Sequence, residues 1–289
     1  MLKNPKLGGL LRSPDDPEGR PLIQKGKFLM GANWTIPIVD GIPDFITYAP
    51  RTQRSLVFDI PLMEKPSLEL LKPPVIREGP PKWFKEEKYK YPLLKDHRKG
   101  LLLDAGCGQG NRSTFEKLGY EYIGLDISFN SQQRCRGPSD LDIVADCHRL
   151  PLPSGSIEAI NITAVLEHLY CPPLAVREFN RVLKSGGLLV GSCSFLEGEH
   201  FDSQHHYSYL GLYRLLKYAG LEVTHIYPGL SLWEMHSYSL YFSLPAHRWM
   251  GKLHRKLYLV LIGLKSKESA QKRLLRHAAI LHFVAFKRS

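Results

Sequence analysis

The chain has 289 residues, a mass of 32.9 kDa, 43% hydrophobic residues and a formal net charge of +11. This length allows one sizeable core, so any second domain must be small. The five cysteines form no CxxC pair, which favours free thiols over a disulfide framework, and no apolar run reaches the roughly 20 residues that span a bilayer. We therefore expect a cytoplasmic protein.

The first 99 residues divide into two parts. Residues 1–47 are expected to form a small unit ending in "TIPIVDGIPDF", where two prolines and a glycine punctuate short apolar pieces. Residues 48–99 are too rich in proline and charge to form a core, so we interpret them as a connector. Residues 100–289 would then form the main domain.

A regular alternation of strand and helix patterns begins at Leu101. Strand-like apolar runs occur at 101–104, 121–126, 141–145, 157–163, 187–193 and 221–226, and helical patterns at 172–184 and 208–219. Gly186 and Gly187 would end the first of these helices. The alternation predicts an α/β fold, in which a parallel sheet carries helices on both faces.

The segment "LLLDAGCGQG" (101–110) places three glycines at alternate positions behind an acid. A strand, a tight turn and a helix beginning near Arg112 would bring bare backbone against a ligand at the carboxyl edge of the sheet. Asp126 follows about 20 residues later, where a carboxylate can accept the hydroxyls of a ribose. Asp104 would repel a pyrophosphate but suits a cationic ligand, such as the ammonium and sulfonium of S-adenosylmethionine.

Four segments in order resemble the class I S-adenosylmethionine-dependent methyltransferases, over residues 101 to about 223. They are "LLLDAGCGQG", "YIGLDIS", "VADCHRLPLPSGSIEAI" and "NITAVLEHLYCPPLAVREFNRVLKSGGLLVGS". The resemblance implies a Rossmann-like doubly wound sheet, mostly parallel with an antiparallel last strand. Residues 277–287, "HAAILHFVAFK", match that last strand.

The resemblance also implies a set of cofactor-binding residues. For the methionine portion they are Asp104, Gly106, Gly108, Gly110 and Thr163. For the ribose and adenine they are Asp126, Ile127, Asp146 and Cys147. Asp126 would accept the ribose hydroxyls and Asp146 the adenine amino group, with the Cys147 amide near a ring nitrogen. Taken singly, Asp146 also fits a turn and Ile127 a core position, but their joint spacing favours the cofactor.

Candidate catalytic residues follow the fourth and fifth strands. His168 lies in "VLEHL" and either faces the substrate or caps a helix. The segment 197–223 places His200, His205, His206 and Tyr207 just before a helix, and it resembles an acceptor-site segment in part of this superfamily. We expect His206 and Tyr207 to shape the acceptor pocket, with His205 or His206 as general base. The alternative is a helix cap with surface histidines.

Positive charge concentrates near the carboxyl end. Residues 231–289 contain 11 Lys and Arg against two acids, and residues 231–276 would be an insertion before the last strand. Apolar residues at helical spacing within it predict a helix packed on the domain, a lid, or a peripheral membrane contact for a lipid-linked acceptor.

The N-terminal unit resembles the small zinc-ribbon domain of the tRNA-methyltransferase activator family, which closes with a similar "P-I-x-D-G-I-P". Ser13, Asp15 and Asp16 stand in the region of the first expected cysteine pair, and the first cysteine of the chain is Cys107. We therefore predict a unit without zinc, serving packing or interaction, and no metal site in the chain.

These patterns leave three functions open. The favoured one is a methyltransferase that uses S-adenosylmethionine and acts on oxygen or nitrogen of a small-molecule, glycan or lipid-linked acceptor. The second is an RNA or protein methyltransferase, suggested by the basic tail, although "NITAV" lacks the Pro-Pro-aromatic motif of base methylation. The third is a catalytically silent cofactor-binding partner of another enzyme.

Overall fold

The computed structural model describes residues 2–13, 16, 19–31, 34–46, 92–128, 140–197, 203–229, 260 and 278–289. Its N-terminal part holds a short 3-10 helix, η1 (Pro5–Leu7), and a four-stranded antiparallel sheet. The strands of this sheet run in the order β1 (Ile23–Lys25), β2 (Phe28–Met30), β3 (Thr35–Val39) and β4 (Ile42–Pro43).

The larger sheet has seven strands in the order β10-β11-β9-β8-β5-β6-β7. These strands are β5 (Leu101–Ala105), β6 (Glu121–Asp126), β7 (Ile143–Val144), β8 (Ile157–Thr163), β9 (Leu183–Ser194), β10 (Leu221–Pro228) and β11 (Ile280–Lys287). Neighbouring strands from β7 to β9 pair in parallel, whereas β11 runs antiparallel to both β9 and β10. The predicted fold class is confirmed, including its antiparallel last strand.

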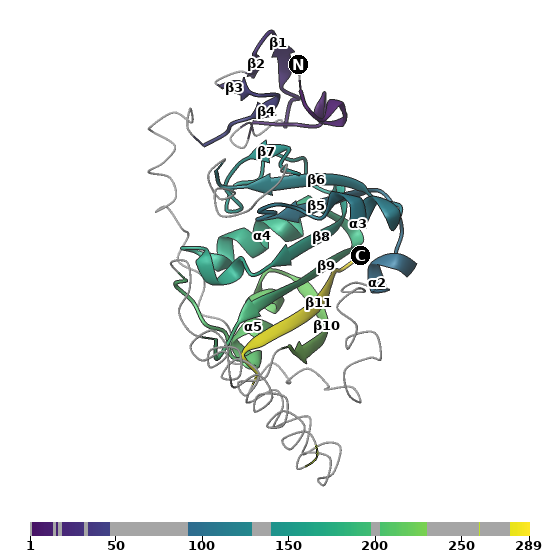
Figure 1. Cartoon of the computed structure of the whole chain (residues 1–289), viewed down its shortest axis with the longest axis vertical. Coiled ribbons are helices and arrows are strands. Elements are labelled where there is room, and N and C mark those ends of the chain that lie inside the picture. The colour runs from purple at the N-terminus through teal and green to yellow at the C-terminus, as the bar shows by residue number, and fades with distance from the viewer. Residues whose placement is uncertain are drawn as a thin grey trace, which may run out of the picture.

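Helices cover both faces of this sheet (Figure 1). They are α2 (Pro92–Asp96), α3 (Arg112–Lys117), α4 (Pro172–Val182) and α5 (Tyr209–Tyr218). Successive residues of β5 point to opposite faces, so Leu103 packs in the core with Phe179 of α4, while Leu102 packs with Leu94 of α2 and Phe115 of α3. This two-sided burial explains why the strands are continuous apolar runs.

The predicted end of helix α4 is wrong. Helix α4 stops at Val182, and the chain continues directly into β9, whereas Gly186 and Gly187 were expected to end the helix. The two glycines instead lie where the β8–β9 register shifts, between the pairs Ile157–Leu183 and Ala159–Leu188. A left-handed φ of +72° at Gly186 accommodates this irregularity.

The N-terminal unit packs against the β7 edge of the large sheet (Figure 1). Asp44 forms a parallel bridge with Val144, and the Phe45 amide donates to the Val144 carbonyl over 2.8 Å. Buried Leu7 and Trp34 belong to the same apolar cluster as the strands of the main domain. The unit therefore extends the main core.

Two further predictions fall largely outside the described residues. Of the insertion 231–276, only Val260 is described, and it is 54% exposed. Most of the connector 48–99 is also outside them, although its end forms α2, whose Leu94 is fully buried. No helix within the described ranges is long and apolar enough to cross a bilayer.

Candidate active site

Four parallel strands bring the predicted cofactor residues to one edge of the sheet. Asp104 lies at the end of β5, Asp126 ends β6, Asp146 follows β7, and Thr163 ends β8. Chain order reverses at β5, because β6 and β7 lie on one side of it and β8 and β9 on the other. Ligands of open α/β sheets bind at the carboxyl ends of strands beside such a reversal.

The glycine turn has one face filled by protein and one face open. All three glycines adopt left-handed φ angles, +70° at Gly106, +54° at Gly108 and +84° at Gly110. A Cβ on Gly106 would overlap Val165, and one on Gly110 would lie 2.8 Å from the Tyr122 hydroxyl. A Cβ on Gly108 would meet no atom of the described residues within 4 Å, so this side of the turn is bare backbone there.

Asp104 is a buried carboxylate held by two side-chain donors. The Tyr122 hydroxyl donates to its Oδ2 over 2.8 Å, and Asn161 Nδ2 donates to its Oδ1 over 2.6 Å. The Thr163 hydroxyl donates in turn to Asn161 Oδ1 over 3.1 Å. Burial raises the pKa of Asp104, although both hydrogen bonds act in the opposite direction. A cationic ligand beside this group would favour its ionised form.

Asp126 joins the end of β6 to the glycine turn. Its Oδ2 accepts from the Gly108 amide over 2.8 Å, and its Oδ1 from the Ile127 amide over 2.7 Å. The carboxylate is buried, whereas Ile127 is 50% exposed. The exposed Ile127 side chain could pack against the flat face of a nucleoside base, while the neighbouring Asp126 carboxylate accepts hydrogen bonds from the ribose of that nucleoside.

Asp146 is paired with a histidine that the sequence argument did not assign. The His148 amide donates to Asp146 Oδ1 over 2.9 Å, and His148 Nδ1 contacts the same oxygen. The His148 ring stacks on Tyr170 with centroids 3.8 Å apart. Cys147 is buried, which raises the pKa of its thiol and keeps it protonated, so its side chain is suited to packing.

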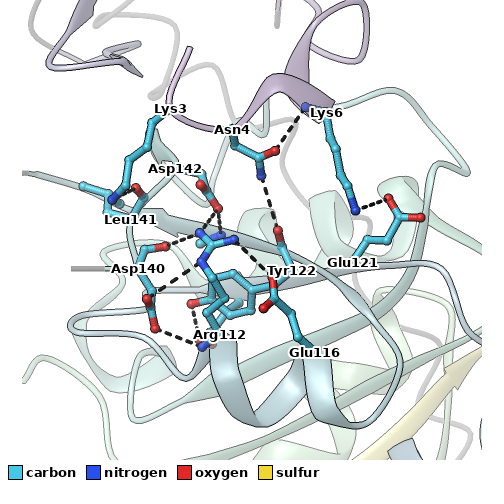
Figure 2. Close-up of polar contacts among 12 residues, drawn as sticks. Lys3, Asn4, Lys6, Arg112, Glu116, Glu121, Tyr122, Asp140, Leu141 and Asp142 are labelled. Atoms are coloured by element: carbon cyan, nitrogen blue, oxygen red, sulfur yellow. Dashed lines mark hydrogen bonds and ion pairs between the residues drawn. The ribbon is translucent and has the colours of Figure 1, made fainter. Parts of the chain in front are cut away.

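Arg112 contacts acidic residues near the glycine turn, and Figure 2 shows its polar contacts with Asp140 and Asp142. Its Nη2 lies 2.8 Å from Oδ2 of buried Asp142, and its guanidinium lies 4.6 Å from the centre of the Tyr122 ring. The Arg112 amide donates to Asp140 Oδ2 over 2.9 Å. Tyr122, which binds Asp104, is therefore held between the core and a cation.

The N-terminal unit reaches the same region (Figure 2). Asn4 Nδ2 donates to the Tyr122 carbonyl over 3.4 Å, and Lys3 Nζ donates to the Leu141 carbonyl over 3.3 Å. Lys6 pairs with Glu121 over 3.0 Å, but both side chains are more than half exposed, so this ion pair contributes little.

The predicted catalytic residues lie beside the ends of β8 and β9. The His205 amide donates to the Glu167 carbonyl over 3.0 Å, and the Tyr207 amide to the Ser194 carbonyl over 2.9 Å. The His205 and Tyr207 rings are 6.0 Å apart. His168 ends the 3-10 helix η6 (Leu166–His168), so the expected helix start at this point is a single turn, and α4 follows it.

The three side chains of this segment differ in setting. His206 is exposed, and its Nδ1 lies 3.1 Å from the Phe195 carbonyl, whereas His205 is half-buried. Burial raises the pKa of Tyr207, so its hydroxyl stays protonated and acts as a donor, here to the Leu166 carbonyl over 3.4 Å. His200 lies outside the described residues.

Sequence reasoning missed four supporting residues: Tyr122, Asn161, Arg112 and His148. Asn161 carried a usable signal, because it is a lone amide in the otherwise apolar run "AINI", and a buried polar group needs a partner. Tyr122 and Arg112 carried no such signal, because their partners are distant in sequence. His148 carried none either, because it resembles an ordinary turn residue.

Residues 103–191 match the family model described as "Methyltransferase domain". An uncharacterized chloroplast methyltransferase of Arabidopsis thaliana is 34% identical over 130 residues, covering 40% of this chain and 37% of that protein. A malonyl-[acyl-carrier protein] O-methyltransferase of Hamiltonella defensa is 32% identical over 105 residues, covering 35% and 40%. A solved S-adenosylmethionine-dependent methyltransferase of Mesorhizobium loti is 17% identical, with a TM-score of 0.42 over 68% of this chain and 97% of that one.

The match to this family model runs from β5 to β9. It supports the predicted class I enzyme and S-adenosylmethionine as its cofactor. This chain spans about two fifths of the length of the curated relatives it matches. The matched segment does not include the N-terminal unit or residues 203–207.

Proposed function

We propose that this chain is an S-adenosylmethionine-dependent methyltransferase that methylates oxygen or nitrogen of a small-molecule, glycan or lipid-linked acceptor. The observation that carries the proposal is the row of carboxylates at Asp104, Asp126 and Asp146, at or just after the ends of three adjacent parallel strands beside Gly108. Their spacing suits a ligand with a cation, a ribose and a base.

The residues present fit this cofactor. Asp104 would face the ammonium group, because its buried carboxylate gains most from a neighbouring cation. Asp126 would accept the ribose hydroxyls, and exposed Ile127 would pack on the adenine. Asp146 would accept from the adenine amino group, and the Cys147 amide would face a ring nitrogen. When bound, S-adenosylmethionine supplies the methyl group from its sulfonium by in-line displacement.

The acceptor would be held by the segment before α5. His205 is the better placed general base, because it is half-buried beside Tyr207, whereas His206 is exposed. Tyr207 would shape the acceptor pocket, and His168 would border it from η6. The remaining task of the protein is to align the acceptor and exclude water. One relative is named an O-methyltransferase, which supports oxygen as the receiving atom.

Calorimetry with S-adenosylhomocysteine tests the cofactor assignment. Asp126→Asn should weaken binding by about 10-fold to 100-fold, because it weakens hydrogen bonds to a charged acceptor. Asp96→Asn, at an exposed carboxylate at the end of α2, is the matched control and should bind as the wild type does. Absence of binding to the wild type would overturn the proposal.

Turnover with labelled S-adenosylmethionine and fractionated metabolite, lipid and RNA extracts tests the acceptor class. A labelled small molecule, glycan or lipid is expected, and label only in RNA or protein would contradict this part. His205→Ala should lower the rate at least 100-fold without changing S-adenosylhomocysteine affinity, whereas His206→Ala should lower it less than fivefold. Equal effects of the two variants would remove His205 as base.

We propose that the protein acts in the cytoplasm. Residues 231–276 would pack on the domain or serve as a lid, and a peripheral membrane contact is the alternative. The excess of Lys and Arg in this region would attract an anionic surface. A membrane contact would appear in liposome sedimentation as binding that requires anionic lipid and falls with salt. Equal recovery with neutral and anionic vesicles would exclude this contact.

A further inference from the structure

Asp146 is held by two groups of a single residue. The His148 backbone amide donates to Oδ1, and the His148 ring nitrogen Nδ1 contacts the same oxygen. The His148 side chain is 4% exposed, whereas that of Asp146 is 26% exposed. Both contacts act on Oδ1, so they restrict the rotation of the carboxylate, to which the Tyr170 side chain also hydrogen-bonds.

The second ring nitrogen of His148 defines the tautomer. Nε2 accepts from the Cys171 amide over 3.2 Å, so in neutral imidazole it carries no proton. The proton therefore sits on Nδ1, which donates to Asp146. We assign this tautomer from the hydrogen-bond network.

The ring also ties Asp146 to the other side of the site. It stacks on Tyr170 at 3.8 Å, and Cys171 immediately precedes α4, which follows η6 and His168. Burial, and then the neighbouring Asp146 carboxylate, raise the pKa of Tyr170. His148 thus lies between the adenine end of the cofactor site and the start of α4.

We infer that His148 is a positioning residue that orients the Asp146 carboxylate to accept the 6-amino group of adenine. This inference rests on the proposed cofactor. Without the ring, the carboxylate would keep the His148 amide and Tyr170 as partners but lose the second contact on Oδ1. Its orientation would be less restricted, and the discrimination between a 6-amino and a 6-oxo purine would weaken. The discrimination arises because a 6-oxo group has no proton to give to a carboxylate.

Three substitutions separate the two ring contacts. His148→Phe keeps an aromatic ring against Tyr170 but removes both polar contacts. His148→Asn places an amide N–H close to the former Nδ1, so it keeps the donor to Asp146. His148→Gln places its amide near the former Nε2, so it can keep the contact to Cys171 but not the donor. His225→Phe, at a histidine stacked on Tyr227 in β10, is the matched control.

The measurement is calorimetric affinity for S-adenosylhomocysteine and for its 6-oxo analogue, S-inosylhomocysteine. The Phe and Gln variants should lose about tenfold in the ratio of the two affinities, mainly by weaker binding of the 6-amino ligand. The Asn variant and the His225→Phe control should stay within about threefold of the wild type. Histidine nitrogen NMR of the ligand-free protein should show Nδ1 protonated.

The outcomes are distinguishable. A wild type that does not bind S-adenosylhomocysteine refutes the proposed function. A wild type that binds it, with an unchanged ratio in the Phe and Gln variants, refutes the role of His148 alone. If the Phe variant does not fold, the Asn and Gln variants decide, and equal ratios for these two would show that the donor to Asp146 is irrelevant.

Discussion

The glycine turn offers a sharp comparison between two neighbouring glycines. Both Gly108 and Gly110 have left-handed φ angles, so alanine at either position is strained by about 1–2 kcal/mol, less a few tenths regained from a stiffer unfolded chain. At Gly110 the new Cβ would also overlap Asp140 and lie 2.8 Å from the Tyr122 hydroxyl. Overpacking of this kind adds about 1–3 kcal/mol.

We therefore expect Gly110→Ala to lower the free energy of unfolding by about 2–4 kcal/mol, and Gly108→Ala by about 1 kcal/mol. Ligand affinity should show the opposite order among folded molecules. Gly108→Ala adds a methyl group to the open face of the turn, so it should weaken S-adenosylhomocysteine binding by about tenfold or more. Urea unfolding followed by fluorescence gives the first quantity, and calorimetry gives the second.

We therefore predict that Gly110→Ala is the less stable of the two variants and that Gly108→Ala is the weaker binder of S-adenosylhomocysteine. If the two variants were equally stable, the contacts behind Gly110 would be relieved at no cost, and the close packing assigned to that face would be wrong. If Gly108→Ala bound S-adenosylhomocysteine as the wild type does, the open face would not be the ligand face.

Three further predictions concern the residues behind the site and the N-terminal unit. Burial raises the pKa of Asp104, so ionisation of this group opposes folding. The free energy of unfolding of the wild type, relative to that of Asp104→Asn, should therefore decline as the pH rises above about 4. Urea unfolding at several pH values measures this difference, and a constant difference would contradict the prediction. Arg112→Met should cost about 2–4 kcal/mol, because it removes the cation from buried Asp142, whose Oδ2 would keep only the Gly124 amide as donor among the described residues. Arg98→Met, at a 60% exposed side chain, should cost less than about 1 kcal/mol, because its partner Glu158 keeps Lys184. Similar costs would refute this role of Arg112. Leu7→Ala should lower the free energy of unfolding by about 2–5 kcal/mol, because Leu7 is buried in the main core. Circular dichroism and fluorescence should both report a single cooperative transition. An unchanged main transition would show that the N-terminal unit folds independently of the main domain.

Much of the fold could be predicted because burial on both faces turns each central strand into a readable apolar run. The run 121–126 coincides with β6, and 157–163 coincides with β8. The end of α4 could not be read in the same way. Leu183 is apolar in either structure, and only its pairing with Ile157, a long-range contact, places it in a strand. Local sequence does not record such a contact.

The site divides similarly into predictable and hidden parts. Asp104 and Asp126 could be predicted as candidate site residues because each lies at the end of an apolar strand. The structure places both at the same edge of the large sheet. The partners that orient them are separated in sequence, since Tyr122 lies 18 residues and Asn161 57 residues from Asp104. The apolar run around Asn161 marks it as a buried polar group, but it does not say which carboxylate Asn161 binds, and nothing local marks Tyr122. Only the folded chain brings both side chains to Asp104.

The two halves of the site differ in how they are held, and this difference has a consequence for specificity. The cofactor half is fixed by buried side chains, such as Asp104 and Asn161, and by backbone donors at Gly108. The acceptor half that we propose, residues 203–207, is attached through backbone hydrogen bonds, with His206 exposed. Substitutions in residues 203–207 can thus change the acceptor without disturbing the carboxylates. Acceptor choice should evolve there, while the cofactor half tolerates little change.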